Sequence, residues 1–253
     1  MAEKFIAKHT TASLQALIDD KRKAVIALVP IGSTEPHGPH LGLGTDVIIS
    51  AAACIKAAEL LEKKGTMRAV IAPAVPYGVT ECAAGFAGAV TVPAAVLTSY
   101  IAAIADSLLA NGIRHVCLVN NHLEPGQDAA LRAVLPGREN KVSYACPLTR
   151  KWARTLSAEF KSGACHAGQY ETSIVMAAAP ELVDDDIRRQ LPAVTISLSE
   201  KLTAGVGTFT DMGMELAYTG APAKASLEEG AAMIGRLADM VVGEVRESLG
   251  LPT

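Results

Sequence analysis

The chain has 253 residues, 50% of them hydrophobic, and a formal net charge of -3 at pH 7. Its charged residues are spread along the sequence and form no basic stripe of the kind that nucleic-acid-binding proteins carry, so we predict no nucleic-acid partner. A chain of this length can bury one large core, and we predict a single domain over residues 1–253.

The cysteines and the amino terminus bear on the cellular compartment. Five cysteines are scattered along the chain without a C-x-x-C pair: Cys54, Cys82, Cys117, Cys146 and Cys165. We expect reduced thiols, as in cytoplasmic proteins. The first ten residues, MAEKFIAKHT, lack the apolar segment of a signal peptide, which also favours a cytoplasmic location.

Four apolar runs of strand length alternate with helical patterns along the chain. They cover residues 24–30, 68–75, 114–120 and 141–147 and are almost continuously apolar. Strands buried on both faces have this composition, and the segments between them are long enough for crossover helices. We predict an α/β fold with a mostly parallel central sheet that is covered by helices on both sides.

The expected helices carry recognisable ends. Residues 46–65 end in two lysines and a glycine, and residues 94–112 end in Asn-Gly, both of which are C-cap sequences. The last helix begins with Ser226 and Glu229 in capping-box spacing and stops at Gly250. Its apolar face should comprise Leu227, Ile234, Leu237, Val241 and Val245. Residues 180–225 have mixed propensities and give no assignment.

Residues 85–105 run for 21 positions without a charge, which is about the length that spans a bilayer. Pro93 lies near the middle and follows the β-type run AVTV. We therefore predict a short buried strand, a turn and a buried alanine-rich helix, and no membrane partner.

A glycine-rich loop with metal-type ligands follows the first apolar run. Its sequence, IGSTEPHGPHLGLGTD, spans residues 31–46 and contains Glu35, His37 and Asp46. Glu35 and His37 are separated by one residue, so their side chains can point to the same side of an extended segment. The glycines at 38, 42 and 44 permit the loop to curl back toward Asp46 at the start of a helix.

Two further clusters carry the same residue types. His122 and Glu124 lie in VNNHLEPGQ at the carboxyl end of the third apolar run, and His166 and Glu171 lie in CHAGQYETS. Carboxyl ends of parallel strands are where open α/β sheets form their sites, so the clusters are expected to converge.

Together the candidate residues are three histidines, His37, His122 and His166, and four carboxylates. Mixed imidazole and carboxylate ligands suit zinc, manganese or iron rather than calcium. The set exceeds the needs of one tetrahedral zinc and fits two divalent ions about 3.5 to 4 Å apart, bridged by a carboxylate. Metal binding lowers the pKa of water to roughly 7, which makes a nucleophile available at neutral pH.

The chain resembles the creatininase (creatinine amidohydrolase) family in VPIGSTEPHGPHLGLGTD, FAGAVTV, VNNHLEP, CHAGQYETS and YTGAPAKASLEEG, in this order. The resemblance implies a three-layer α/β/α sandwich and two divalent metal ions per chain, zinc and/or manganese or else iron. It also implies hydrolysis of a non-peptide C–N bond in a small-molecule amide, cyclic or linear. The resemblance further implies a homo-oligomer, often a hexamer.

The same resemblance suggests roles for individual residues. The implied metal ligands, with Asp46 as the bridge, are Glu35, His37, Asp46, His122 and Glu171. Glu124 is implied as an acid/base group or an extra ligand, His166 as a proton-transfer group, and Thr80 as a hydroxyl that contacts the substrate. We interpret His40 as a residue that orients a ligand, and we predict surface or structural roles for His9 and His115.

One departure from the family argues against creatinine as the substrate. Creatinine-hydrolysing members surround the substrate with tryptophans, one of them shortly before the histidine matched by His166, where this chain has EFKSGA. Alternatives are a formamide on a pyrimidine nucleotide in flavin or deazaflavin biosynthesis and a modified peptide. The lack of a basic cluster near the loops disfavours a phosphorylated substrate. A non-catalytic metal-binding accessory protein and a lyase or isomerase are further hypotheses.

Overall fold

The computed structural model describes residues 3–63 and 65–252. These residues form a four-stranded parallel sheet of order β2-β1-β3-β4. The strands are β1 (Ala24–Ile31), β2 (Met67–Ile71), β3 (His115–Asn120) and β4 (Val142–Ala145). The predicted parallel sheet is confirmed, but the second run was predicted too long. Pro73 has no N–H for the ladder, so β2 ends at Ile71 and Val75 makes only an isolated bridge.

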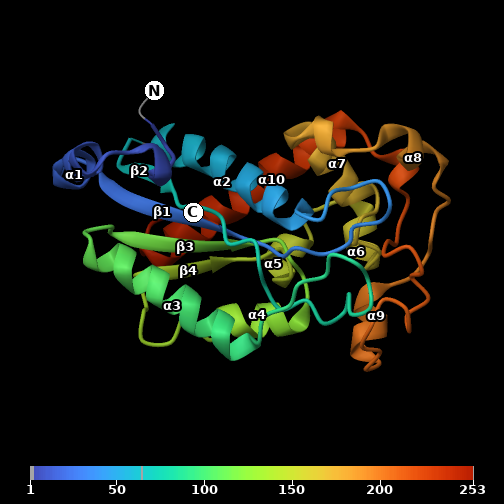
Figure 1. The fold of residues 1–253 in the computed structure, drawn as a ribbon. Coiled ribbons are helices and arrows are strands. Elements are labelled where there is room, and N and C mark those ends of the chain that lie inside the picture. The colour runs from blue at the N-terminus through green and yellow to red at the C-terminus, as the bar shows by residue number, and fades with distance from the viewer. Residues whose placement is uncertain (1–2, 64, 253) are drawn as a thin grey trace.

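Helices cover both faces of the sheet (Figure 1). The α-helices are α1 (Thr11–Asp19), α2 (Thr45–Lys63), α3 (Ala94–Ala110), α4 (Pro125–Arg132), α5 (Arg150–Ala153), α6 (Ala158–Ser162), α7 (Gln169–Ala178), α8 (Asp185–Gln190), α9 (Leu198–Thr203) and α10 (Leu227–Ser248). Short 3-10 turns cover η1 (Ile6–Lys8), η2 (Pro180–Leu182) and η3 (Pro222–Lys224). Helices α2, α7 and α10 lie over one face, and α3 and α4 over the other, which gives the three-layer α/β/α sandwich.

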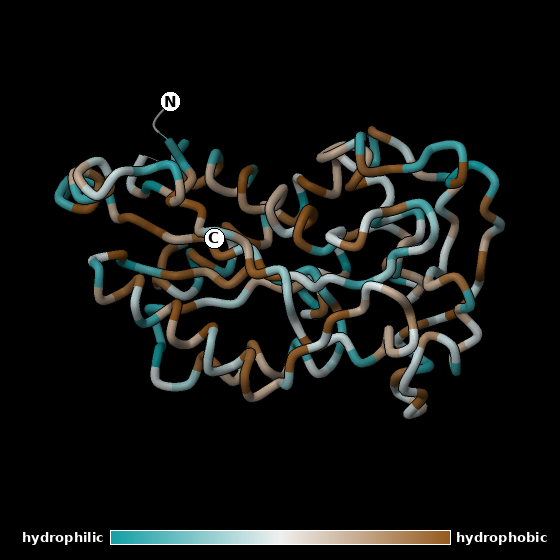
Figure 2. The backbone as a smooth tube through the Cα atoms, viewed as in Figure 1, coloured by the Kyte–Doolittle hydropathy of each residue, from teal (hydrophilic) through white to brown (hydrophobic). Residues whose placement is uncertain are grey.

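Two apolar cores sandwich the sheet because successive residues of a strand point to opposite faces. In β1, Ile26 and Leu28 belong to the core beneath α2 and α10, whereas Val25, Ala27 and Val29 belong to the core beneath α3. The apolar strands are visible as brown stretches of the tube in Figure 2.

The long uncharged segment differs from the prediction. Val90 and Thr91 form only isolated bridges and are exposed, so the expected buried strand is not formed. Helix α3 is also only partly covered, since its buried residues are Leu97, Ile101 and Ala105. Over the described residues, every helix is too short or too polar to cross a bilayer.

Residues 196–217, which the sequence left unassigned, form most of a third and smaller apolar cluster. It contains Leu198, Phe209, Met212, Met214 and Ala217, together with Cys82 and Ala83 from the loop after β2. Helix α9 and its neighbours thus pack beside the carboxyl end of the sheet (Figure 1).

Candidate metal centre

The loop between β1 and α2 brings its ligand-type residues together through one close backbone approach. A Cβ on Gly32 would lie only 2.6 Å from the backbone nitrogen of Val47 and 2.8 Å from Asp46 Cβ. Only glycine therefore lets the start of α2 approach the end of β1, which brings Asp46 beside the loop. Gly38 also matters, because its φ of +65° is left-handed. Gly42 and Gly44 have φ values outside that region and no described atom within 4 Å of a built Cβ beyond their chain neighbours, so the structure shows no steric need for glycine at these two positions.

Asp46 lies between two histidines that come from different strand ends. Its Oδ1 is 3.2 Å from His37 Nε2, and its Oδ2 is 3.0 Å from His122 Nδ1. Glu35 Oε1 is 3.2 Å from the same His122 Nδ1, and Glu171 Oε2 is 3.6 Å from His37 Nε2. The five side chains thus form two overlapping sets that share Asp46, namely Glu35, Asp46 and His122, and His37, Asp46 and Glu171.

Hydrogen bonds to backbone carbonyls orient both imidazoles. His37 Nδ1 donates to the carbonyl of Glu35 at 3.2 Å, which turns Nε2 toward Asp46. His122 Nε2 donates to the carbonyl of Val79 at 2.6 Å, which turns Nδ1 toward Asp46 and Glu35. Metal-bound histidines are commonly held in this way by their second nitrogen.

A buried glutamine fixes the Val79 peptide that orients His122. The Gln127 Oε1 atom accepts the N–H of Val79 at 2.9 Å. Its Nε2 donates to Asn120 Oδ1 at 3.3 Å and points to the Gly32 carbonyl at 3.5 Å. Gln127, fully buried in α4, therefore ties together the chain segments that carry the site. This role of Gln127 is not predictable from the sequence, because nothing in the sequence joins it to Val79, 48 positions away.

Helix α7 contributes Glu171 from its first turn. The N–H of Ala167 donates to Glu171 Oε2 at 2.7 Å, and Ala167 itself has a φ of +51°. His166 just before it donates through Nε2 to the carbonyl of Pro36 at 3.0 Å, which leaves Nδ1 free. That atom lies 3.9 Å from Glu35 Oε1, and His166 forms a further possible ligand set with Glu35 and His37.

The chemistry of this cluster fits divalent cations. Glu35 Oε2 is buried without a hydrogen-bond partner among the described residues, and His37 Nε2 and Asp46 Oδ2 make close histidine–carboxylate ion pairs that lack hydrogen-bond geometry. Buried carboxylates require a compensating charge, which two divalent ions would supply. Glu35, His37, Asp46, His122 and Glu171 are the residues that would hold them.

The pKa values show how strongly the cluster demands positive charge. Burial alone would lower the pKa of His37, but the carboxylates, Asp46 foremost, outweigh it and raise the pKa to about 10. Burial is likewise outweighed at His122, whose pKa Glu35 and Asp46 hold well above its usual range. Burial raises the pKa of Glu171 to about 8. Protonated histidines therefore balance the carboxylates in the protein alone.

The other predicted residues take different positions. Glu124 lines a pocket that opens onto the cluster, and its carboxylate accepts hydrogen bonds from the N–H groups of Glu81 at 2.8 Å and Cys82 at 3.2 Å. Burial raises the pKa of Glu124. Burial, assisted by the charge of His37, lowers the pKa of His166 to about 4.

Thr80 and His40 are not among the described residues that line the pocket beside the cluster. The Thr80 hydroxyl is buried and hydrogen-bonded to the Ser33 hydroxyl. His40 Nε2 lies 2.9 Å from the hydroxyl of Thr172, next to Glu171 in α7. Burial lowers the pKa of His40 to about 4. Their roles toward a substrate and a ligand stay predictions.

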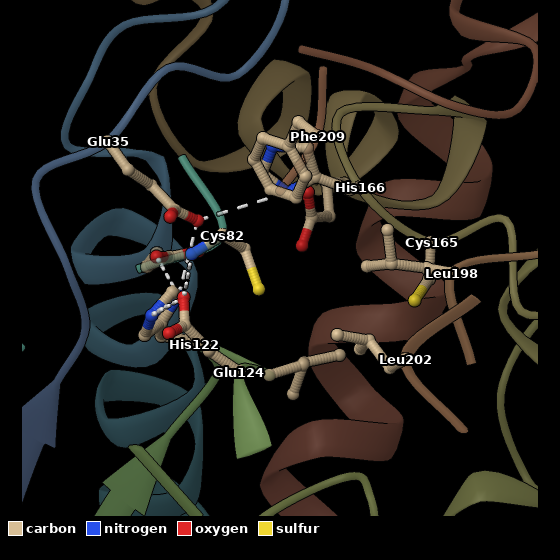
Figure 3. A pocket seen from close by; sticks show the side chains of 12 residues that line it. Glu35, Cys82, His122, Glu124, Cys165, His166, Leu198, Leu202 and Phe209 are labelled. Atoms are coloured by element: carbon tan, nitrogen blue, oxygen red, sulfur yellow. Dashed lines mark hydrogen bonds and ion pairs between the residues drawn. The ribbon is translucent and has the colours of Figure 1, made fainter. Parts of the chain in front are cut away.

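A small pocket, about 30 Å³ in enclosed volume, opens onto the cluster. Figure 3 shows ligand-type and apolar side chains on its walls. Six lining residues were not predicted to face the site, and they are Cys82, Leu123, Cys165, Leu198, Leu202 and Phe209. No sequence signal distinguishes these thiols and apolar side chains from ordinary core residues. The arrangement as a whole is that of an α/β metal-binding protein with its site at the carboxyl ends of the strands.

Comparisons with known proteins agree with this class. The sequence profile of the creatininase family, described as creatinine amidohydrolase, matches residues 7–245. A mycofactocin precursor peptide peptidase of Mycolicibacterium smegmatis is 28% identical over 225 residues, which cover 85% of this chain and 84% of that protein. The creatinine amidohydrolase of Pseudomonas putida is 27% identical over 183 residues, which cover 64% of this chain and 67% of that protein. The chain belongs to the creatininase family of hydrolases.

Solved structures share the fold. A manganese form of creatininase superposes with a TM-score of 0.69 and 22% identity, covering 98% of this chain and 99% of its own. A Zn–Zn form of a creatininase variant superposes with a TM-score of 0.69 and 21% identity over the same shares of the two chains, 98% and 99%.

Proposed function

We propose that the protein is a dinuclear metal-dependent amidohydrolase that cleaves a non-peptide C–N bond of a small amide other than creatinine. Glu35, His37, Asp46, His122 and Glu171 hold two divalent ions, zinc and/or manganese or else iron, with Asp46 as the bridge. One observation carries the proposal, namely that the two carboxylate oxygens of Asp46 face different histidines, at 3.2 and 3.0 Å. The names of the manganese and Zn–Zn structures support these metals.

The chemistry divides between the ions and two side chains at the pocket. When bound, the cations supply Lewis acidity and lower the pKa of water from about 15.7 to about 7. Glu124 is held by two backbone N–H groups at the pocket wall, where its carboxyl can exchange a proton with the substrate. His166 donates its Nε2 hydrogen to Pro36, so its Nδ1 is available to accept a proton.

A peptide bond is the second candidate, because the relatives that match most of this chain are named peptide peptidases. A nucleotide formamide is less well supported, since no lysine or arginine in the described chain lines the pocket to bind a phosphate. Glu124 and His166 are both present beside the ligand set, which argues against a purely accessory metal-binding protein.

Activity assays on the zinc- or manganese-loaded chain distinguish these candidates. Small amides, formamides and short peptides are incubated in ¹⁸O-water, and the products are analysed by mass spectrometry. We expect ¹⁸O in the carboxylate released from a small amide. Release from peptides alone supports the second candidate. Turnover without solvent oxygen indicates a lyase or isomerase and contradicts hydrolysis.

We further propose that the chain acts as one domain in the cytoplasm and forms a homo-oligomer, a hexamer by family resemblance. Light scattering after gel filtration measures the oligomer directly. A monomer at micromolar concentration contradicts this part of the proposal.

A further inference from the structure

The pocket has two chemically different sides. Glu35, His122 and Glu124 lie on one side in Figure 3, and Cys165, Leu198 and Leu202 lie across from them. A substrate whose amide reaches the ligand cluster must therefore rest another part of itself against the opposite side, which we call the apolar wall. We define the apolar wall by Cys165, Leu198, Leu202 and Phe209.

Backbone hydrogen bonds and packing hold the apolar wall in place. Leu198 and Leu202 are four residues apart on α9, so they point to the same side of the helix. The N–H of Leu198 donates to the Gly163 carbonyl at 2.8 Å, and the N–H of Phe209 donates to the Cys82 carbonyl at 2.8 Å. The wall residues Leu198, Leu202 and Phe209 also belong to the third apolar cluster, which has its own packed interior. The wall is thus a preformed surface, as binding pockets usually require.

The apolar wall offers nothing to a charged group. In the part of the chain that the structure describes, the lining contains no lysine or arginine, and its carboxylates lie in the ligand cluster and at Glu124. An anionic group against the apolar wall would lose its hydration without gaining a cationic partner there, and a cationic group against the leucines would lose its hydration likewise.

The wall is also poorly suited to a flat ring. Phe209 is the aromatic residue among the described lining residues that could stack with one. Its ring already packs against His166 with centroids 4.5 Å apart, and the residue is only 3% exposed. The two leucines instead present branched aliphatic groups, whose many small dispersion contacts favour an apolar group that fits closely against them.

We infer that the pocket selects an amide whose neutral, branched aliphatic group packs against Leu198 and Leu202. The inference rests on the proposed function, because the amide itself is held at the ligand cluster. The enclosed space of the pocket is small, about 30 Å³, so a compact aliphatic group fits better than an extended or polycyclic one.

Hydroxamates test this inference because they bind metal centres without being cleaved as amides. The probes for the zinc-reconstituted full chain are acetohydroxamate, isovalerohydroxamate, benzohydroxamate and the anionic succinic monohydroxamate, with Kd measured by calorimetry. Isovalerohydroxamate has three more aliphatic carbons than acetohydroxamate. At roughly fourfold per buried methylene, we expect it to bind about 50-fold more tightly. We expect the benzo and succinic probes to bind more weakly than the isovaleryl probe.

Variants of the wall sharpen the test. Leu202→Asn should reduce the 50-fold preference to about fivefold or less, and the milder Leu202→Ala should reduce it in the same direction. Leu216→Asn is the matched control, because Leu216 is 55% exposed and does not belong to the described pocket lining. It should retain the full preference.

Each outcome separates the inference from the proposed function. Hydroxamates that bind with equal affinity, or a benzo or succinic probe that binds most tightly, would overturn the aliphatic preference while leaving the metal centre intact. A preference that survives in both Leu202 variants would show that the wall does not cause it. A zinc-reconstituted protein that holds no zinc and binds no hydroxamate would overturn the proposed function and the inference together.

Discussion

Two buried histidines on and just beyond β3 have opposite environments. His115 begins the strand, where its Nε2 lies 2.8 Å from the Ser143 hydroxyl, and burial lowers its pKa to about 4. His122 follows the strand, and its Nδ1 is within 3.2 Å of both Glu35 and Asp46. Both side chains are almost fully buried. The amino end of β3 therefore carries a neutral histidine that contributes to packing. The carboxyl end instead concentrates negative charge that only cations can balance.

Among changes near the carboxyl end of β3, Glu124→Gln should have the largest effect on catalysis. Removing the acid/base group should lower kcat roughly 10²- to 10⁴-fold with metal retained. Steady-state kinetics and elemental analysis measure the two quantities. Glu81→Gln is the matched control, because the Glu81 side chain is exposed and only its backbone contacts Glu124. Loss of metal with the rate in Glu124→Gln would instead make Glu124 a ligand.

Metal removal should lower the stability of the protein through the carboxyl end of β3 and not through His115 at its amino end. With free metal at 100 to 1,000 times its Kd, chelation should lower the free energy of unfolding by about 3 to 4 kcal/mol. Urea unfolding with and without chelator measures the difference. His115→Gln should show the same chelator effect, since His115 lies outside every ligand set of the described residues. A chelator effect that disappears in this variant would contradict the separation.

His115, at the amino end of β3, should make a contribution to folding stability that depends on pH. The pKa of His115 is about 4 in the folded protein against 6.5 ordinarily, so folding favours the neutral form by about 3 kcal/mol. This stability is fully present above pH 6.5 and is lost as the pH falls toward 4.

A comparison of wild type with His115→Gln isolates that contribution. Urea unfolding in chelator should show the wild type losing up to about 3 kcal/mol relative to the variant between pH 7 and pH 4. The other buried histidines are common to both proteins, so their titration cancels in the difference. A difference that does not change with pH would show that burial leaves His115 unperturbed.

The smallest effect concerns the support of His122. Gln127→Ala frees the Val79 peptide, and the loss of such an outer hydrogen bond typically weakens metal affinity about 10- to 100-fold. Zinc competition with a chromophoric chelator measures the affinity, and ¹⁵N-histidine spectra report which nitrogen of His122 carries hydrogen. Gln15→Ala on exposed α1 is the control. An unchanged zinc affinity and an unchanged His122 tautomer would show that Gln127 does not support the site through His122.

The sequence allowed the clustering of the ligand-type residues to be predicted, because these residues are chemically distinctive and follow strand ends. Glu35, His37 and His122 are types that rarely become buried without a partner, so their positions after apolar runs indicated a site. The parallel sheet was predictable for a similar reason, since its strands are continuously apolar.

The apolar wall and the Gln127 support could not be predicted. Leu198, Leu202 and Phe209 belong to types that occur in every core, and they reach the pocket only through tertiary packing with the loop after β2. The apolar face expected for the last helix was wrong at its first residue. Leu227 is 58% exposed, whereas Leu237, Val241 and Val245 are buried. Periodicity indicates a face but does not say how far along the helix a partner extends.

The central claim is the metal centre bridged by Asp46, and the metal-to-protein ratio tests it most directly. Elemental analysis after gel filtration is carried out on the wild type, on Asp46→Ala and on the control Asp106→Ala, whose side chain is exposed on α3. We predict about two ions per chain in the wild type and the control, and fewer than one in Asp46→Ala. A wild-type ratio near zero that zinc, manganese and iron all fail to restore would contradict the account, as would an Asp46→Ala variant that keeps both ions.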